Sequence, residues 1–233
     1  MLPTEIRTPR LLLRPWGPND AAAMKEAVDS SLDHLRESVA WARAEPTELP
    51  ALAARLAAFA AAFSNGEEWI YAVLDRSNAR VLGGVAAERA DTALVALVGT
   101  ETVEVGYWLR ADATGQGYAA EATAALVEVV FAHLGVRRVA ICHDPANGAS
   151  GAVPRRLGFT RYGVVTNAVL PERQAADGRV RAATEVWTLE RSNLSRRKSL
   201  GIPPTAHSLG TQEPDRVGYE CSQPARQVVA NGS

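Results

Sequence analysis

The stretch that decides the fold is GYWLRADATGQGYAAEATAALVEVVFAHLG, residues 106–135. It reads as the end of a strand, a loop that contains Gly115 and Gly117, and a long helix that starts near Tyr118. Glycine adopts backbone conformations that other residues resist and allows a backbone to approach a ligand closely. The first turn of a helix carries unpaired N–H groups and a partial positive charge. The loop is therefore a candidate phosphate site, although a tight turn before a helix would use the same glycines.

The composition describes a folded chain without a strong charge bias. Its 233 residues are 47% apolar and the net charge is -1, which suits one domain and does not favour a nucleic-acid partner. Cys142 and Cys221 lie far apart in the sequence and show no metal-ligand spacing, so no metal is expected. The N-terminus does not resemble a secretory signal, and no apolar run reaches membrane-spanning length. We therefore expect a cytoplasmic protein with no membrane partner.

The elements around the opening stretch predict an α/β (α+β) domain. One helix should begin in the alanines after Asp20, with an apolar stripe that runs from Ala22 to Leu35, and a second carries an apolar stripe from Leu49 to Phe63. The long helix covers about 118–134, and a short helix lies near 147–159. After about residue 192 the chain is rich in Ser, Pro, Gly and Gln, so we predict a domain over 1–192 and a disordered tail over 193–233. The predicted strands cover 10–16, 69–75, 81–91, 102–110, 136–144, 160–165 and 183–191.

Strand 102–110 helps to decide between two interpretations of the glycine loop. The pattern Gly115-x-Gly117-x-x-Ala120 fits a dinucleotide-binding fingerprint on paper, with Asp144 ending the next strand. In that fold the first glycine directly follows the strand, whereas here residues 110–114 intervene. The strand also alternates, which is untypical of a buried parallel strand. Its two faces are Val103, Val105, Tyr107 and Leu109 on one side and Glu104, Gly106 and Trp108 on the other.

Four stretches in this order resemble the GNAT N-acetyltransferases, and within them the RimJ/RimL branch of ribosomal-protein N-terminal acetyltransferases. They are TPRLLLRPW, EVGYWL, GQGYAAEA and DPANGASGAVPRRLGF, and the resemblance covers about residues 5–190. It implies a mixed, mostly antiparallel central sheet flanked by helices, with the fourth and fifth strands splayed to hold acetyl-CoA. The chain departs from the pattern at Asp112, where many members have Gln or Arg, and at Gly151 and Pro154, which favour helix poorly.

The resemblance implies that acetyl-CoA is the acetyl donor, and it assigns residues to each part of the cofactor. The pyrophosphate would lie on backbone amides of the loop and first helical turn, at Gly115, Gln116, Gly117, Tyr118, Ala119 and Ala120. The pantetheine arm would run beside Tyr107, Trp108 and Leu109. Asn147 matches an asparagine that bonds this arm, although Asp-Pro-Ala-Asn-Gly is also a strong turn sequence.

The resemblance also implies direct transfer to a primary amine in a ternary complex. Ser150 would be an acid toward the sulfur, although it could simply cap the short helix. Glu104 would be the base, through a water, although it could be a surface carboxylate. His34 and Trp41 would line the acceptor site, with Asp33, Glu67 and Glu68 nearby, although His34 could be a solvated helix residue.

Two questions stay open at this stage. The acceptor is either a protein N-terminus or a small amine, because the acceptor pocket comes from helices that transfer poorly between family members. The alternative function is a non-catalytic acyl-CoA-binding or sensing module on the same fold, in which Glu104 and Ser150 would be dispensable. A homodimer is compatible with the resemblance.

Overall fold

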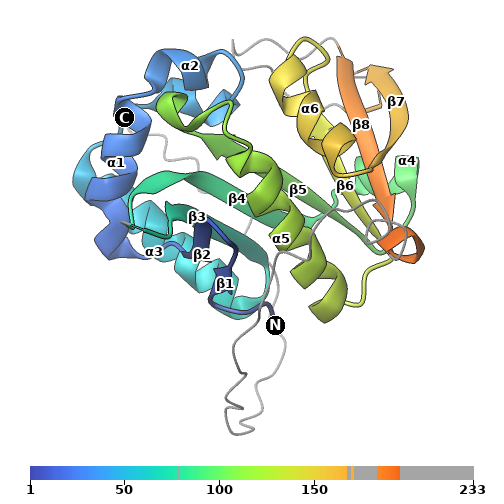
Figure 1. Cartoon of the computed structure of the whole chain (residues 1–233), viewed down its shortest axis with the longest axis horizontal. Coiled ribbons are helices and arrows are strands. Elements are labelled where there is room, and N and C mark those ends of the chain that lie inside the picture. The colour runs from blue at the N-terminus through green and yellow to red at the C-terminus, as the bar shows by residue number, and fades with distance from the viewer. Residues whose placement is uncertain (78, 167–168, 171–182, 195–233) are drawn as a thin grey trace, which may run out of the picture.

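A computed structural model of the chain describes residues 1–77, 79–166, 169–170 and 183–194, and its centre is an eight-stranded sheet (Figure 1). The strand order is β1-β2-β3-β4-β5-β6-β8-β7, and only the β5–β6 pair is parallel. Nearly all of the predicted tail lies outside the described residues. The strands are β1 (Ile6–Arg7), β2 (Leu11–Pro15), β3 (Glu68–Asp75), β4 (Val81–Arg89), β5 (Thr102–Leu109), β6 (Arg138–His143), β7 (Thr160–Thr166) and β8 (Ala183–Glu190).

Helices cover both faces of the sheet. The predicted long helix is α5, and it packs on the face that carries Val103, Val105 and the Tyr107 ring. The opposite face meets α1 and α3 over β2–β4 and α4 over β6 and β8. The helices are α1 (Ala21–Asp29), α2 (Leu32–Arg36), α3 (Leu49–Asn65), α4 (Thr92–Val98), α5 (Tyr118–His133) and α6 (Gly148–Arg156), with short 3-10 turns η1 (Pro18–Asp20), η2 (Ala40–Ala44), η3 (Ala111–Ala113) and η4 (Arg191–Asn193).

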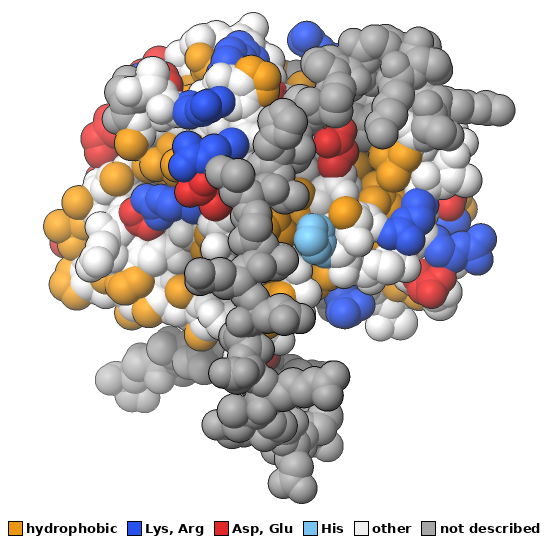
Figure 2. Space-filling model, turned by 60° about the horizontal axis from the view of Figure 1, so that its bottom comes forward, with side chains coloured by type: hydrophobic (Ala, Val, Ile, Leu, Met, Phe, Trp, Pro, Cys, Tyr) orange, Lys and Arg blue, Asp and Glu red, His pale blue; other side chains and the backbone are white. Residues whose placement is uncertain are grey.

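The described surface mixes its charges. On the face shown in Figure 2, Lys and Arg side chains alternate with acidic and hydrophobic ones. Within the described ranges, no helix is long and apolar enough to cross a membrane.

Two helices differ from the sequence prediction. The first predicted helix breaks after Asp29, and α2 starts again at Leu32. Ser31 lies at the break, buried, where its hydroxyl accepts the N–H of Ala111 at 3.0 Å, so a tertiary contact fixes the turn. The second difference is α4, which the sequence analysis missed. Its seven residues are too few to show a helical period in the sequence. The one local sign of the helix is Asp91, whose carboxylate caps it by accepting the Leu94 N–H at 2.7 Å.

The sheet opens between β5 and β6, as predicted for the fourth and fifth strands of the main sheet. These strands pair only from Thr102 with Arg138 to Glu104 with Ala140. Beyond that point β5 continues to Leu109 against β4, and β6 continues to His143 against β8. The backbone of residues 105–109 therefore faces a gap rather than a neighbouring strand, which leaves room for an extended ligand.

A buried arginine ties the start of the glycine loop to the first helix. Arg110 is only 3% exposed, and its guanidinium donates to Glu26 at 2.7 and 2.8 Å and to Asp112 at 2.7 Å. The hydrogen bond from Arg110 holds the pKa of Glu26 below its usual range. Since Arg110 ends β5 and Glu26 lies on α1, this cluster fixes where the loop leaves the sheet.

Replacing Arg110 by Met should lower the free energy of unfolding by about 1–3 kcal/mol, because its three charge-assisted hydrogen bonds to Glu26 and Asp112 are lost. The matched control is Arg80→Met, which removes an exposed pair with the same Asp112 and should cost at most about 1 kcal/mol. Denaturant unfolding of the three proteins measures both effects. Equal losses for the two variants would contradict the structural role of Arg110.

The contribution of Arg110 should depend on pH with a defined sign. Because the folded state lowers the pKa of Glu26, the stabilisation is fully present above the ordinary glutamate pKa, near ~4.3. This stabilisation is lost as the pH falls through the lowered pKa of Glu26. The difference in free energy of unfolding between wild type and Arg110→Met should therefore become smaller in acid.

Candidate functional site

The glycine loop has the backbone geometry that its sequence predicts. Gly115 and Gly117 have φ values of 73° and 80°, in the left-handed region that favours glycine. Gly117 is the N-cap of α5 and provides no side-chain cap, so the first-turn amides at 118–120 are not satisfied by a capping side chain. The 16-residue helix adds its dipole at this end. This is the backbone geometry that suits an anionic group, so the loop remains the candidate phosphate site.

Two arginines that the sequence analysis did not single out flank this loop. A Cβ atom on Gly117 would lie 3.6 Å from Arg156 Nη1 and 3.7 Å from Arg10 Nη2. Arg10 is braced by Glu121 at 2.6 Å and donates to the backbone oxygen of Gln116 at 2.9 Å. No local pattern in the sequence indicates this, because Arg10 and Arg156 come from opposite ends of the domain and only the fold brings them to one loop.

The opening between β5 and β6 contains two cavities that meet. The smaller, of about 330 Å³, is bordered by the glycine loop, α5 and α6, and includes Leu109, Gly115, Gly117, Ala119 and Ala120. The larger, of about 660 Å³, extends across β3–β5 toward α1 and α3. Both are lined by Tyr107, Trp108, Asn147 and Ser150. These four predicted residues therefore stand at the junction.

Two residues of the predicted cofactor loop, Gln116 and Tyr118, turn their side chains away from the cavities. The side chains of Gln116 and Tyr118 line neither cavity among the described residues. The side-chain amide of Gln116 instead donates to the backbone oxygen of Asp112 at 3.1 Å, within the same loop. The Tyr118 ring stacks under the Arg10 guanidinium, 4.5 Å from the ring centre. Both side chains brace the loop from outside.

Tyr107 and Pro154 explain how Ser150 is held. Pro154 lies inside α6 and has no N–H, so it cannot make the helical hydrogen bond to the Ser150 oxygen four residues earlier. The Tyr107 hydroxyl donates to that oxygen instead, at 2.7 Å. The same hydroxyl accepts from Ser150 Oγ at 3.4 Å. The proline that departs from the family pattern is therefore compensated by a tyrosine from β5.

Asn147, rather than Ser150, caps α6. Its side-chain oxygen accepts the Ser150 N–H at 2.9 Å, which makes Asn147 the N-cap residue. The alternative that Ser150 is a helix cap is therefore wrong. The turn role of Asn147 is present in the structure, while its contact with a cofactor stays a prediction.

The departure at Gly151 is explained by its contact with His143 on β6. A Cβ atom on Gly151 would lie 2.9 Å from His143 Cε1, so glycine lets α6 pack on the imidazole. Trp187 Nε1 donates to His143 Nε2 at 3.1 Å. His143 Nδ1 lies 2.8 Å from the backbone carbonyl oxygen of Asp144. These partners place the ring hydrogen on Nδ1. With Nε2 an acceptor, the 3.4 Å contact to Glu185 is not an ion pair.

Glu104 is buried, at 7% exposure, so the alternative of a surface carboxylate is wrong. It lines neither cavity among the described residues. Its neighbour across the β4–β5 ladder is Glu88, which is exposed and stands on the wall of the larger cavity. The sequence analysis missed Glu88, because only the strand register shows that it shares a face with Glu104.

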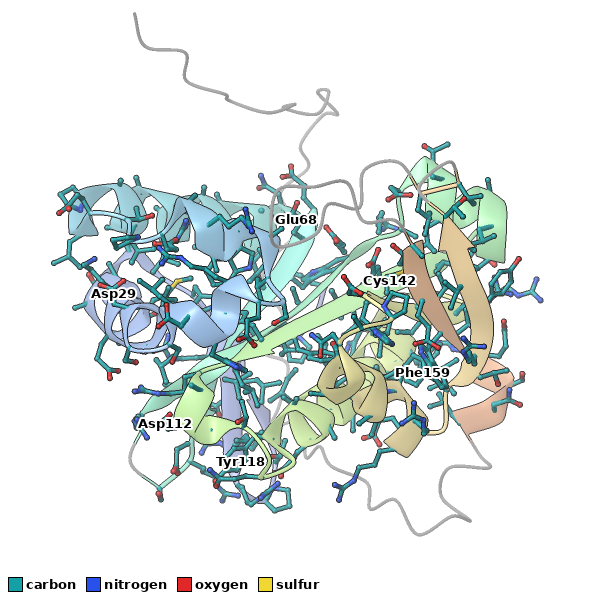
Figure 3. All side chains as sticks on the ribbon, turned by 90° about the horizontal axis from the view of Figure 1, so that it is seen from above. Asp29, Glu68, Asp112, Tyr118, Cys142 and Phe159 are labelled. Carbon is teal, nitrogen blue, oxygen red and sulfur yellow. The ribbon has the colours of Figure 1, made fainter. Side chains whose placement is uncertain are left out.

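The predicted acceptor residues separate in the structure. Trp41 lines the larger cavity and meets Trp108 edge to face, with ring centres 5.5 Å apart. His34 lines the smaller cavity. Figure 3 shows Glu68 on the α3 side of the sheet, opposite Tyr118, but neither Glu68 nor Asp33 and Glu67 lines the cavities. In the part of the chain that the structure describes, no cluster of His, Cys, Asp and Glu could hold a metal ion.

Residues 10–160 match the family described as the acetyltransferase (GNAT) domain, so the chain belongs to the GNAT acetyltransferase family. A curated relative, the putative ribosomal N-acetyltransferase YdaF of Bacillus subtilis (strain 168), is 40% identical over 60 residues. That match covers 26% of this chain and 33% of the relative, so the chain matches about a third of the relative's length.

Solved structures of the same fold include members of the predicted branch. RimJ of Mycobacterium smegmatis, in complex with a CoA-disulfide, superposes with a TM-score of 0.66 at 18% identity, over 84% of this chain and 92% of that chain. RimL in complex with coenzyme A has a TM-score of 0.66 at 19% identity, over 81% and 97%. A microcin self-immunity acetyltransferase, MccE, in complex with acetyl-CoA and AMP, has a TM-score of 0.66 at 19% identity, over 78% and 93%. The predicted family resemblance and fold class are confirmed.

Replacing Gly117 by Val should weaken coenzyme A binding by at least about tenfold, because a β-branched side chain resists the left-handed conformation and enters the anion site. The control is Gly135→Val at the other end of α5, where φ is 67° and the space is open. It carries the same strain and should leave the affinity unchanged. Calorimetric titration with coenzyme A measures both, and wild-type affinity in Gly117→Val would contradict the assignment.

Tyr107→Phe should lower the free energy of unfolding by about 1–3 kcal/mol, because the Ser150 oxygen loses its donor. Adding Pro154→Ala restores an N–H for that oxygen, so the loss should be smaller in the double variant than in Tyr107→Phe alone. A double-mutant cycle by denaturant unfolding measures the coupling. Additivity within about 0.5 kcal/mol would show that the tyrosine does not substitute for the missing helical bond.

Proposed function

We propose that the protein is an acetyl-CoA-dependent N-acetyltransferase that acts on a primary amine. The observation that carries this proposal is the meeting of the two cavities at Ser150, with the glycine loop on one side and the larger cavity over β3–β5 on the other. A binding module needs only the first cavity, whereas a group-transfer enzyme needs two substrates to meet. Family membership and the coenzyme A complexes of the structural neighbours support the same conclusion.

The residues present fit acetyl-CoA. The uncapped amides at 118–120 would hold the pyrophosphate, and Arg10 and Arg156 lie beside Gly117 where they would neutralise phosphate charge. The edge of β5 at 105–109 that faces the gap has no strand partner on that side and would hold the pantetheine arm like an added strand. The side chain of Trp108, in contrast, packs toward α1 and α3, so its contact with the arm would come from the backbone.

Acetyl-CoA supplies a thioester whose carbonyl carbon forms a bond to the amine nitrogen while its carbon–sulfur bond breaks. Ser150 Oγ–H stands at the junction and would donate to the departing sulfur. Burial raises the pKa of Tyr107 to about 12, with the Ser150 hydrogen bond acting in the opposite direction, so its hydroxyl is protonated at neutral pH. Tyr107 thus keeps its bond to the Ser150 oxygen and positions the serine.

The amine must lose a proton, and we propose Glu104 as the acceptor through a water, because its buried carboxylate does not line the cavity directly. An α-amine titrates near ~7.7–8.0, so a fair fraction is neutral without help. Positioning of the amine would then matter more than the strength of the base.

Both acceptor classes have support in the neighbours. The RimL and RimJ names concern ribosomal-protein acetyltransferases, whereas MccE was solved with AMP, a small molecule. These names describe those proteins, and the choice for this chain depends on its own larger cavity.

Ser150→Ala should lower kcat by about 10²-fold, the low end for general acid catalysis, because a thiolate already leaves readily. The KM for acetyl-CoA should change little. Thiol release from acetyl-CoA in the presence of an amine panel is the measurement. Tight coenzyme A binding with no thiol release for any amine would instead support the non-catalytic binding module.

A further inference from the structure

A carboxylate at the end of β6 lines the larger cavity in the same turn as Ser150. Asp144 directly follows His143, the last residue of β6, and both Asp144 and Ser150 border this cavity. The Asn147 N–H donates to the backbone oxygen of Asp144 at 2.9 Å. The side-chain oxygen of Asn147 in turn accepts the Ser150 N–H at 2.9 Å. One hydrogen-bonded turn therefore holds Asp144 beside the residue at which the two cavities meet.

Strand register places Asp144 on the face of the sheet that borders the larger cavity. The last β5–β6 pair is Glu104 with Ala140, and side chains alternate between the two faces along a strand. Trp108 and Asp144 each come four residues after that pair, so they belong to its face, on either side of the gap. The Tyr107 ring lies on the opposite face with α5. A molecule in the larger cavity therefore reaches the gap from the side of Asp144.

Gly106 leaves space open on this same face. It lies between Glu104 and Trp108 on β5, it is exposed, and it lines the larger cavity. A Cβ atom on Gly106 would have no heavy atom within 4 Å. Gly106 is not among the glycines with positive φ, so its backbone does not require glycine. What the glycine provides is room beside the gap, where a second substrate would have to approach the thioester.

The carboxylate of Asp144 has an oxygen available to a ligand. Its Oδ1 accepts the Ala146 N–H at 2.8 Å, which is the usual turn contact of an aspartate. The His143 ring bonds the backbone oxygen of Asp144 and not the carboxylate. Among the residues that the structure describes, Oδ2 has no hydrogen-bond partner and no basic side chain pairs with this carboxylate. A half-buried carboxylate with one such oxygen suits a nitrogen that donates hydrogen bonds.

We propose that Asp144 binds the nitrogen of the acceptor amine and holds it at the gap, in the space that Gly106 leaves open. This inference rests on the proposed acetyltransferase function and names the residue that positions its second substrate. A carboxylate attracts an ammonium ion and also accepts an N–H of the neutral amine, so Asp144 holds the nitrogen in both protonation states. The lone pair of the neutral amine then points away from Asp144. The proton released when the carbon–nitrogen bond forms still leaves through water toward Glu104.

The test measures thiol release from acetyl-CoA by the full chain at pH 7, after the uncatalysed rate is subtracted. Two acceptors, n-butylamine and a serine-initiated tripeptide, are mainly ammonium ions at this pH, whereas hydroxylamine is mainly neutral. Asp144→Asn removes the charge but keeps an oxygen for the Ala146 N–H. It should raise KM for both ammonium acceptors by at least about tenfold, the size of a hydrogen bond to a charged group. It should change kcat/KM for hydroxylamine by less than about threefold and leave KM for acetyl-CoA unchanged.

Three further variants separate charge, turn and space. Asp144→Glu keeps the charge and should recover part of the loss. The matched control is Asp75→Asn, because Asp75 makes the same turn contact with the Ser77 N–H at 2.8 Å and, within the described residues, lines neither cavity. It should behave as wild type. Gly106→Val adds a side chain that suits a strand but fills the open space, so it should raise KM for the tripeptide without altering Asp144.

The outcomes separate this inference from the proposed function. Equal KM values for the ammonium acceptors in Asp144→Asn and Asp75→Asn would overturn the inference and leave the acetyltransferase intact. An equal loss with hydroxylamine would also overturn it, because the turn rather than the charge would then matter. A wild-type KM in Gly106→Val would overturn the assigned approach. Wild-type protein that uses neither ammonium acceptor would overturn the inference, and silence across a wider amine panel, with coenzyme A still bound, would overturn the proposed function as well.

Discussion

The end of pairing between β5 and β6 is the constraint on which the rest of the structure depends. Three residue pairs hold the strands together, up to Glu104 and Ala140, and each strand then follows its other neighbour. The gap leaves strand backbone unpaired beside the N-terminus of α5, and it allows α6 to place Ser150 opposite Tyr107. Both cavities border this opening, so the pocket beside the glycine loop and the larger cavity share one origin.

Residues that would weaken an isolated helix are compensated across this gap. Pro154 deprives the Ser150 oxygen of its helical partner, and the hydroxyl of Tyr107 replaces it. Gly151 favours helix poorly, but a side chain there would collide with the His143 ring. Each unusual residue of α6 thus has its partner on β5 or β6. The helix is held by tertiary contacts more than by its own propensity, which is common for short helices.

The two cavities also differ in how they are built. The smaller cavity is bordered largely by backbone: glycines in left-handed conformation, helix amides and the edge of β5 that faces the gap. The larger cavity is made by side chains from α1, α3 and η2 with the residues just before it, including Trp41 of η2, which come together over β3–β5. Backbone geometry follows from glycine positions and strand order, whereas a side-chain wall changes with every substitution. This is the physical reason that family members share a cofactor while acceptors vary.

The sequence by itself determined the elements that depend on local signals. The glycines at 115 and 117, the long apolar helix after them and the alternation of β5 specify the anion site and the strand that faces it, because turn geometry and side-chain period are local properties. Only the tertiary structure decided which distant residues share the site. The approach of Arg10 to Gly117, the cross-strand position of Glu88 and the burial of Glu104 depend on strand register and sheet order. Strand register is set by packing between elements that are far apart in the chain. A single sequence therefore does not show which of its distant residues lie side by side.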